Sequence, residues 1–149
     1  MKVVILENIR SAYNVGNVIR TADALWWKVW IVGYTPSPID HPKVRKTSLG
    51  AEETTDVQQY NSTQEAIQKA KKLWLQIIAA ELTSHAISLS DFSSSSAKDI
   101  AIIFGNEVEG ILATTLEAVD RVVQIPMQGV KESLNIGQSA AIFMRELGK

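Results

Sequence analysis

Short apolar runs recur along the chain, and polar segments with helical patterns separate them. Most of these runs are apolar at every position rather than at alternate positions, which is typical of strands buried on both faces of a parallel sheet. The expected strands cover residues 2–6, 29–32, 57–60, 73–80, 100–104 and 122–125. This order of strands and helices predicts an α/β domain whose parallel sheet is covered by helices on both faces.

Apolar residues at helical spacing predict a helix over residues 14–25. Ser62 and Glu65 have the spacing of a capping box, which predicts a helix start followed by helix to about residue 72. Further helical turns are expected over residues 44–49, 111–117 and 133–147. The serine-rich segment 82–97 predicts a surface loop with one short ordered piece at 87–89.

Composition excludes several classes of protein. The chain of 149 residues has no cysteine, which removes disulfides, thiolate zinc sites and cysteine nucleophiles. Its two histidines argue against a metal cluster. No apolar run approaches the roughly 20 residues that span a membrane, so the simplest location is the cytoplasm. The net charge of −1 means that any contact with nucleic acid depends on a local patch or on assembly.

The first polar loop leads into the segment NVGNVIRTA, which contains Asn14 and Arg20. Asn14 precedes the expected helix and is a candidate N-cap. Arg20 lies between apolar Ile19 and Ala22, which suggests a half-buried side chain. The planar guanidinium suits oriented contact with a phosphate or a carboxylate. A solvated helix residue is the alternative for Arg20.

The second loop is GNEVEG, which follows the strand expected over residues 100–104. Gly105 lets the backbone approach a ligand closely. Glu107 and Glu109 invite a general acid–base interpretation. Their spacing does not place them on one helix face, so a cooperating pair is not implied. The chain contains no G-x-G-x-x-G and no Walker pattern, which disfavours dinucleotide and nucleoside-triphosphate sites.

The third loop, IPMQGVKESLN, joins the last strand to the last helix. Ser133 and Asn135 lie where that helix begins, and Ser133 is a candidate N-cap. A strand, a loop with glycine and a helix start is also where α/β proteins place ligands. Backbone groups at 125–127 and 134–135 could frame a flat heterocycle between apolar side chains.

Three segments, taken together and in order, resemble the three signature motifs of the SpoU/TrmH family of RNA ribose 2′-O-methyltransferases, in the SPOUT class. The segments are NVGNVIRTA, IIFGNEVEG and QIPMQGVKESLN. The resemblance covers residues 3–147. It implies a deep C-terminal trefoil knot, which is a rare exception to the usual rules of chain connection. It further implies bound S-adenosylmethionine and a homodimer with the site beside the interface.

The resemblance assigns roles to single residues. Arg20 matches the arginine that helps to activate the ribose hydroxyl and holds a phosphate, and Asn14 belongs to the same motif. Glu107 matches a structural and catalytic support, and Ser133 and Asn135 match a polar pair near the cofactor. By this resemblance the expected catalytic residues are Arg20, Asn14, Glu107, Ser133 and Asn135. The residues expected at the cofactor are Leu82, Thr83, Gly105, Asn106, Glu107, Ile125, Met127, Ser133, Leu134 and Asn135.

We therefore expect one catalytic domain over residues 1–149, without the N-terminal RNA-binding extension of many relatives. RNA would then be held by the dimer itself, and the basic residues near the first motif are candidates for phosphate contacts. These candidates are Arg10, Lys43, Arg45 and Lys46. The alternatives are a methyltransferase that acts on a base nitrogen and a non-catalytic RNA-binding module with the same fold.

Two features depart from the family pattern. Trp26 stands where similar sequences commonly have glycine at the end of the first helix, in a geometry that suits glycine best. Trp26, Trp27 and Trp30 lie close together in the sequence; core packing or a dimer surface is the ordinary interpretation, and base stacking the alternative. The second departure is NIGQSAAI, which replaces a more usual small polar run after Asn135.

Overall fold

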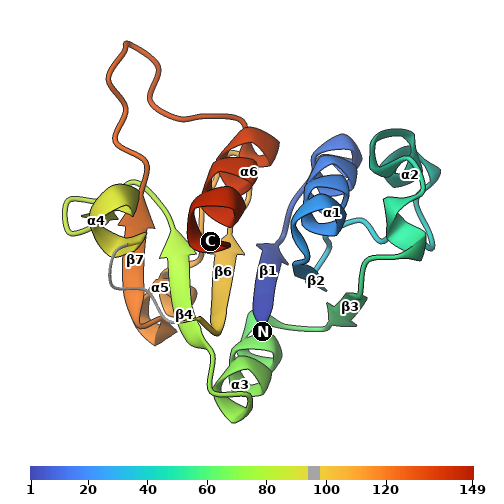
Figure 1. Cartoon of the computed structure of the whole chain (residues 1–149), viewed down its shortest axis with the longest axis horizontal. Coiled ribbons are helices and arrows are strands. Elements are labelled where there is room, and N and C mark those ends of the chain that lie inside the picture. Colours follow the sequence, from blue (N-terminus) through green and yellow to red (C-terminus); the bar gives the residue numbers. More distant parts are fainter. Residues whose placement is uncertain (94–97) are drawn as a thin grey trace.

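The computed structural model describes residues 1–93 and 98–149. Seven strands form one sheet in the order β3-β2-β1-β6-β4-β7-β5, and every strand pair is parallel (Figure 1). The strands are β1 (Lys2–Glu7), β2 (Lys28–Val32), β3 (Val57–Tyr60), β4 (Gln76–Ala80), β5 (Ile87–Ser88), β6 (Ile100–Phe104) and β7 (Arg121–Gln124). The predicted parallel sheet is confirmed. The trefoil knot stays a prediction.

Helices cover both faces of this sheet. They are α1 (Ala12–Leu25), α2 (Pro42–Ser48), α3 (Thr63–Lys72), α4 (Leu89–Ser93), α5 (Ala113–Ala118) and α6 (Ile136–Leu147), with a short 3-10 turn at Ala51–Glu53. Val4 and Leu6 of β1 point to the face of α1, α2, α4 and α6, whereas Val3 and Ile5 point to the face of α3 and α5. Alternate residues of one strand therefore belong to two cores, which explains why the strands are apolar throughout.

Two helix starts differ from the prediction. Ser11, not Asn14, is the N-cap of α1, and its hydroxyl accepts a hydrogen bond from the Asn14 amide at 3.2 Å. Asn135, not Ser133, is the N-cap of α6, and its side-chain oxygen accepts from the Gly137 amide at 2.8 Å. In both loops several polar residues of capping type follow one another. Only the backbone conformation decides which of them caps the helix.

Other boundaries follow the prediction more closely. The cap at Ser62 is confirmed, because its hydroxyl accepts from the Glu65 amide at 3.2 Å. The strand expected from residue 73 begins only at Gln76, since Trp74 takes a left-handed conformation with φ of 59°. The serine-rich segment contains β5 and α4, which include the short ordered piece expected at 87–89. Its residues 94–97 lie outside the described part of the chain.

The four tryptophans divide into two pairs. Trp27 and Trp30 are 3% and 1% exposed, so core packing is confirmed for them. Trp26 and Trp74 are 93% and 90% exposed. Each of these two comes just before a strand, at the amino-terminal edge of the sheet. Trp26 adopts the left-handed cap with φ of 61° and ψ of 45°, so the turn that glycine prefers is formed by tryptophan.

Glycine at position 26 should stabilise the protein. A non-glycine residue in the left-handed region costs about 1–2 kcal/mol, and the exposed indole of Trp26 has little packing to lose. We expect Trp26→Gly to be about 1 kcal/mol more stable than Trp26→Ala in urea unfolding, because both remove the ring and only glycine relieves the backbone. Equal stability of the two variants would contradict this explanation.

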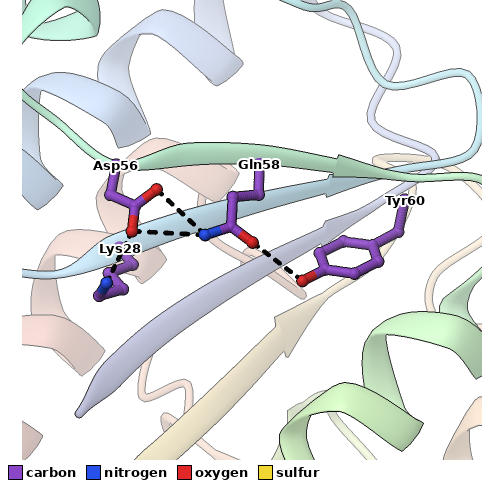
Figure 2. A network of polar contacts seen from close by, with 4 residues as sticks. All are labelled: Lys28, Asp56, Gln58 and Tyr60. Atoms are coloured by element: carbon purple, nitrogen blue, oxygen red, sulfur yellow. Dashed lines mark hydrogen bonds and ion pairs between the residues drawn. The ribbon is translucent and has the colours of Figure 1, made fainter.

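A polar chain ties the edge strand β3 to β2 (Figure 2). The Lys28 ammonium donates to Asp56 Oδ2 at 2.6 Å, Gln58 Nε2 donates to Asp56 Oδ1 at 3.2 Å, and the Tyr60 hydroxyl donates to Gln58 Oε1 at 3.0 Å. The hydrogen bond from Lys28 is the main cause that lowers the pKa of Asp56 below its ordinary value. The Tyr60 ring in turn lies 5.1 Å from the Trp30 ring, between centroids.

The Asp56 carboxylate should make stability depend on pH. Because folding lowers its pKa, the stabilisation is present above the pKa of the unfolded chain and is lost as pH falls through the folded value. We expect Asp56→Asn to lose less than about 1 kcal/mol at pH 7, since both partners are about 40% exposed, and to lose less at pH 2.5 than at pH 7. Urea unfolding at the two pH values measures this. A loss of the same size at both would show that charge is not involved.

Among the helices in ranges 1–93 and 98–149, none is long and apolar enough to cross a membrane.

Candidate functional site

A cavity of about 630 Å³ opens at the carboxyl ends of β4, β6 and β7. Parallel α/β sheets commonly place ligands at this edge. Residues from all three motif segments line it, together with the residues that follow β4. The lining residues are Asn14, Ala80, Glu81, Leu82, Phe104, Gly105, Asn106, Glu107, Val108, Gly110, Val123, Gln124, Ile125, Met127, Ser133, Leu134, Asn135, Ile136, Ser139 and Phe143.

Most residues predicted for the cofactor lie in this wall. They are Leu82, Gly105, Asn106, Glu107, Ile125, Met127, Ser133, Leu134 and Asn135. Thr83 is not among the lining residues, and its carbonyl accepts from the Ala86 amide at 3.3 Å. The cavity has apolar surface on several sides, as a site for a flat heterocycle needs. The side chains that give this surface are Leu82, Ile125, Met127, Leu134 and Phe143.

Asn106 organises the second-motif loop. Its side-chain oxygen accepts from the amides of Val108 and Glu109 at 2.9 and 2.8 Å, and its Nδ2 donates to the Asn8 carbonyl and the Tyr34 hydroxyl, both at 3.0 Å. The side chain is 6% exposed. These four hydrogen bonds fix the loop, so Asn106 shapes the cavity wall and its side chain has little capacity left for a ligand.

Gly105 allows this loop to close tightly. A Cβ at Gly105 would lie 2.5 Å from the Gly110 carbonyl carbon and 2.5 Å from the Ile111 nitrogen. The Gly110 amide also donates to the Asn106 carbonyl at 2.9 Å. The loop therefore requires glycine at 105 for backbone packing within the wall of the cavity.

Glu107 joins the second motif to the loop that directly precedes the first. Its Oε1 accepts from the Arg10 amide at 2.9 Å and its Oε2 accepts from the Ser11 amide at 2.8 Å. A carboxylate with two backbone donors holds the start of α1 against the second-motif loop. The acid–base alternative for Glu107 and Glu109 is not favoured by this geometry, because Glu109 is not among the lining residues.

The first and third motifs also meet directly. Asn135 Nδ2 donates to Asn14 Oδ1 at 3.2 Å, across 121 positions of the sequence. Both residues line the cavity, as does Ser133. Four of the residues that the resemblance assigns to catalysis therefore lie together at the cavity: Asn14, Glu107, Ser133 and Asn135.

Arg20 lies apart from them. Its side chain is exposed on α1 and is not among the lining residues, so the expectation of a half-buried arginine is wrong. The apolar neighbours Ile19 and Ala22 point into the core, whereas position 20 lies on the outer side of the helix. Within the described residues, Arg20 makes no hydrogen bond or ion pair, so its guanidinium is available to a partner.

The candidate RNA contacts are exposed near the first motif. Arg10 precedes α1, and Lys43, Arg45 and Lys46 are on α2, which packs against α1. Arg45 also donates from Nε to the Pro38 carbonyl at 2.9 Å. Of the described residues, no Lys, Arg or His lines the cavity itself.

Two acidic residues near the site were not predicted. Glu81 lines the cavity immediately after β4, and Glu7, at the end of β1, is 1% exposed. Glu7 accepts hydrogen bonds from the hydroxyls of Thr63 and Thr115, each at 2.5 Å, and from the Leu112 amide at 2.9 Å. It therefore links β1 to α3 and α5. A polar residue directly after an apolar strand was the available signal for both.

The described residues contain no group of three or more His, Cys, Asp or Glu side chains arranged to hold a metal ion.

Comparison with known proteins agrees with the motif order. The model of the SpoU rRNA Methylase family matches residues 1–145. A tRNA (guanosine(18)-2′-O)-methyltransferase of Borreliella burgdorferi is 30% identical over 148 residues, with 96% of this chain and 64% of that protein covered. The 23S rRNA (guanosine-2′-O-)-methyltransferase RlmB of Neisseria meningitidis is 30% identical over 143 residues, with 95% and 56% covered.

A solved structure has the same fold. The crystal structure of an AdoMet-bound rRNA methyltransferase from Sinorhizobium meliloti superposes with a TM-score of 0.87 at 24% identity. The match covers 98% of this chain and 55% of that one. The chain thus spans between about half and two thirds of the length of these relatives.

Proposed function

Because the chain belongs to the SpoU rRNA Methylase family, we propose that it transfers a methyl group from S-adenosylmethionine to a ribose 2′-hydroxyl of tRNA or rRNA. One observation carries the proposal: the three motifs, which are far apart in sequence, meet around a single cavity at the carboxyl edge of the sheet. The two similar curated proteins are named as tRNA and rRNA guanosine 2′-O-methyltransferases, which supports the same reaction.

The residues of the cavity fit this cofactor. Apolar side chains of Leu82, Ile125, Leu134 and Phe143 would enclose the adenine, and backbone groups of the loops would bind its polar edge. When bound, S-adenosylmethionine supplies an electrophilic methyl group. Asn135 holds the wall of the site in place through its hydrogen bond to Asn14 of the first motif, and Glu107 does so through its hydrogen bonds to the loop before that motif.

Arg20 would act on the RNA. A ribose hydroxyl is a weak nucleophile at neutral pH and must be placed in line with the methyl group, so positioning supplies much of the rate. Arginine stays protonated in proteins, so we favour a role in which Arg20 binds a phosphate of the RNA and orients the ribose. Its exposed and unpaired guanidinium in the described chain supports this role.

We infer that the working unit is a homodimer in the cytoplasm, where tRNA and rRNA are encountered. Ile142 on α6 is 43% exposed, and Arg20 on the neighbouring α1 does not line the cavity of its own chain. In this proposal the acceptor ribose lies between the cavity and Arg20, either of the same chain or of a second copy. Arg10, Lys43, Arg45 and Lys46 would contact phosphates, which contributes affinity but no sequence preference.

Methylation of total tRNA and rRNA with labelled S-adenosylmethionine, followed by digestion and nucleoside mapping, tests the reaction. A labelled 2′-O-methylnucleoside supports the proposal and identifies the target. A labelled base instead contradicts the ribose assignment. If calorimetry finds no binding of S-adenosylmethionine while RNA still binds, the protein is an RNA-binding module rather than an enzyme.

A further inference from the structure

The Glu81 carboxylate is held at a fixed place in the cavity wall. Glu81 directly follows β4, its Oε2 accepts from the Ile111 amide at 3.1 Å, and its Oε1 accepts from the Leu82 amide at 3.1 Å. Gly110 makes this approach possible, because a Cβ there would lie 2.6 Å from Glu81 Oε2. The second-motif loop is thus built to admit a carboxylate from another strand.

This carboxylate is one of two that determine the charge of the cavity. Glu81 and Glu107 are the two ionisable residues among those that line it, and each accepts hydrogen bonds from two backbone amides, Glu81 from Leu82 and Ile111 and Glu107 from Arg10 and Ser11. Within the described ranges Glu81 forms no ion pair, and no cationic side chain lines the wall. The cavity therefore presents a negative charge, with Glu81 next to the space that a ligand fills, and favours a cation.

The methyl donor and its product differ in charge. In the transfer, the bond from sulfur to the methyl carbon breaks and its electron pair stays on sulfur. A bond forms between the ribose oxygen and that carbon, and the hydroxyl proton passes to solvent water. The positive sulfonium thereby becomes a neutral thioether, while the amino acid and adenosine parts keep their charges.

We propose that Glu81 is a specificity residue that favours the sulfonium form of the cofactor over the neutral product S-adenosylhomocysteine. The inference rests on the proposed function, because it requires S-adenosylmethionine in this cavity. This preference would help the site to release product, since the attraction between Glu81 and the ligand weakens as soon as the methyl group leaves.

Calorimetric titration of the purified protein with each of the two compounds tests this role. Glu81→Gln removes the charge and keeps a side-chain oxygen that can accept from the Ile111 amide. We expect it to lower affinity for S-adenosylmethionine about threefold to tenfold and to change affinity for S-adenosylhomocysteine less than about twofold. Glu109→Gln removes the same charge from the neighbouring second-motif loop, outside the cavity wall, and should leave the ratio of the two affinities unchanged.

The outcomes separate the inference from the function. An equal loss for both compounds would show that Glu81 only supports the loop, and it would overturn the inference while the proposed function stands. Unchanged affinity for both compounds would overturn the inference as well. If the wild-type protein binds neither compound, the proposed function itself fails. A second measurement uses the wild-type protein alone. Raising the ionic strength should weaken S-adenosylmethionine binding more than product binding, and equal weakening of both would contradict the role of Glu81.

Discussion

Replacing Arg20 with alanine is expected to abolish methyl transfer and to leave cofactor binding unchanged. The side chain lies outside the cavity wall and makes no hydrogen bond or ion pair within the described residues, so its loss should disturb neither the fold nor the pocket. The loss of a group that orients the acceptor commonly costs about 100-fold or more in rate. Labelled methyl transfer to RNA and calorimetry with S-adenosylmethionine measure the two effects separately.

Two further variants sharpen this test. Arg20→Lys keeps the charge without the planar fork, so partial activity would indicate a phosphate contact by charge and none would indicate oriented binding. Arg121→Ala removes an arginine at the start of β7, at the opposite edge of the sheet from the cavity, and should retain activity. Transfer at the wild-type rate by Arg20→Ala would refute the assignment taken from the family motif.

Gly16→Ala is expected to be the most destabilising single methyl addition in the first motif. A Cβ at position 16 would lie 2.2 Å from the Val44 carbonyl oxygen and 2.9 Å from the Ser48 nitrogen, both backbone atoms of α2. Alanine gains about 1 kcal/mol in helix propensity, but overpacking against backbone costs about 1–3 kcal/mol or more. The clash should prevail because neither helix can move without disturbing the core, and we expect a net loss of about 2 kcal/mol in urea unfolding.

Gly129→Ala is the matched control for this substitution. An added Cβ there meets nothing within 4 Å, and the residue lies in the exposed third loop. Its stability should stay within about 0.5 kcal/mol of the wild type. If Gly16→Ala were as stable as this control, α1 and α2 would have to pack less closely than the structure describes.

Much of the fold could be predicted from local pattern. Strands such as Ile100–Phe104 are continuous apolar runs, and such a run is buried wherever the chain places it. The expected order of strands and helices and the parallel sheet are therefore confirmed. The family could also be inferred, because three motifs in a fixed order are a property of the sequence alone.

The exact helix starts could not be predicted in the same way. Ser11 and Asn14, or Ser133 and Asn135, are all suitable capping residues, and a cap depends on which residue leaves the helical conformation. Trp26 shows the reverse case. A bulky side chain argues against a left-handed turn, yet Trp26 adopts one between α1 and β2, and its exposed ring is accommodated by solvent.

By itself, then, the sequence determined most of the strands, the parallel α/β class and the family, because each of these follows from neighbouring residues or from motif order. Only the tertiary structure decided which side chains meet. Asn14 contacts Asn135 across 121 positions, and Glu7 reaches Thr115 across 108. The tertiary structure likewise places Glu81 in the cavity wall and Arg20 outside that wall. Such placements depend on distances between segments remote in sequence, and hydrophobic periodicity carries no information about those distances.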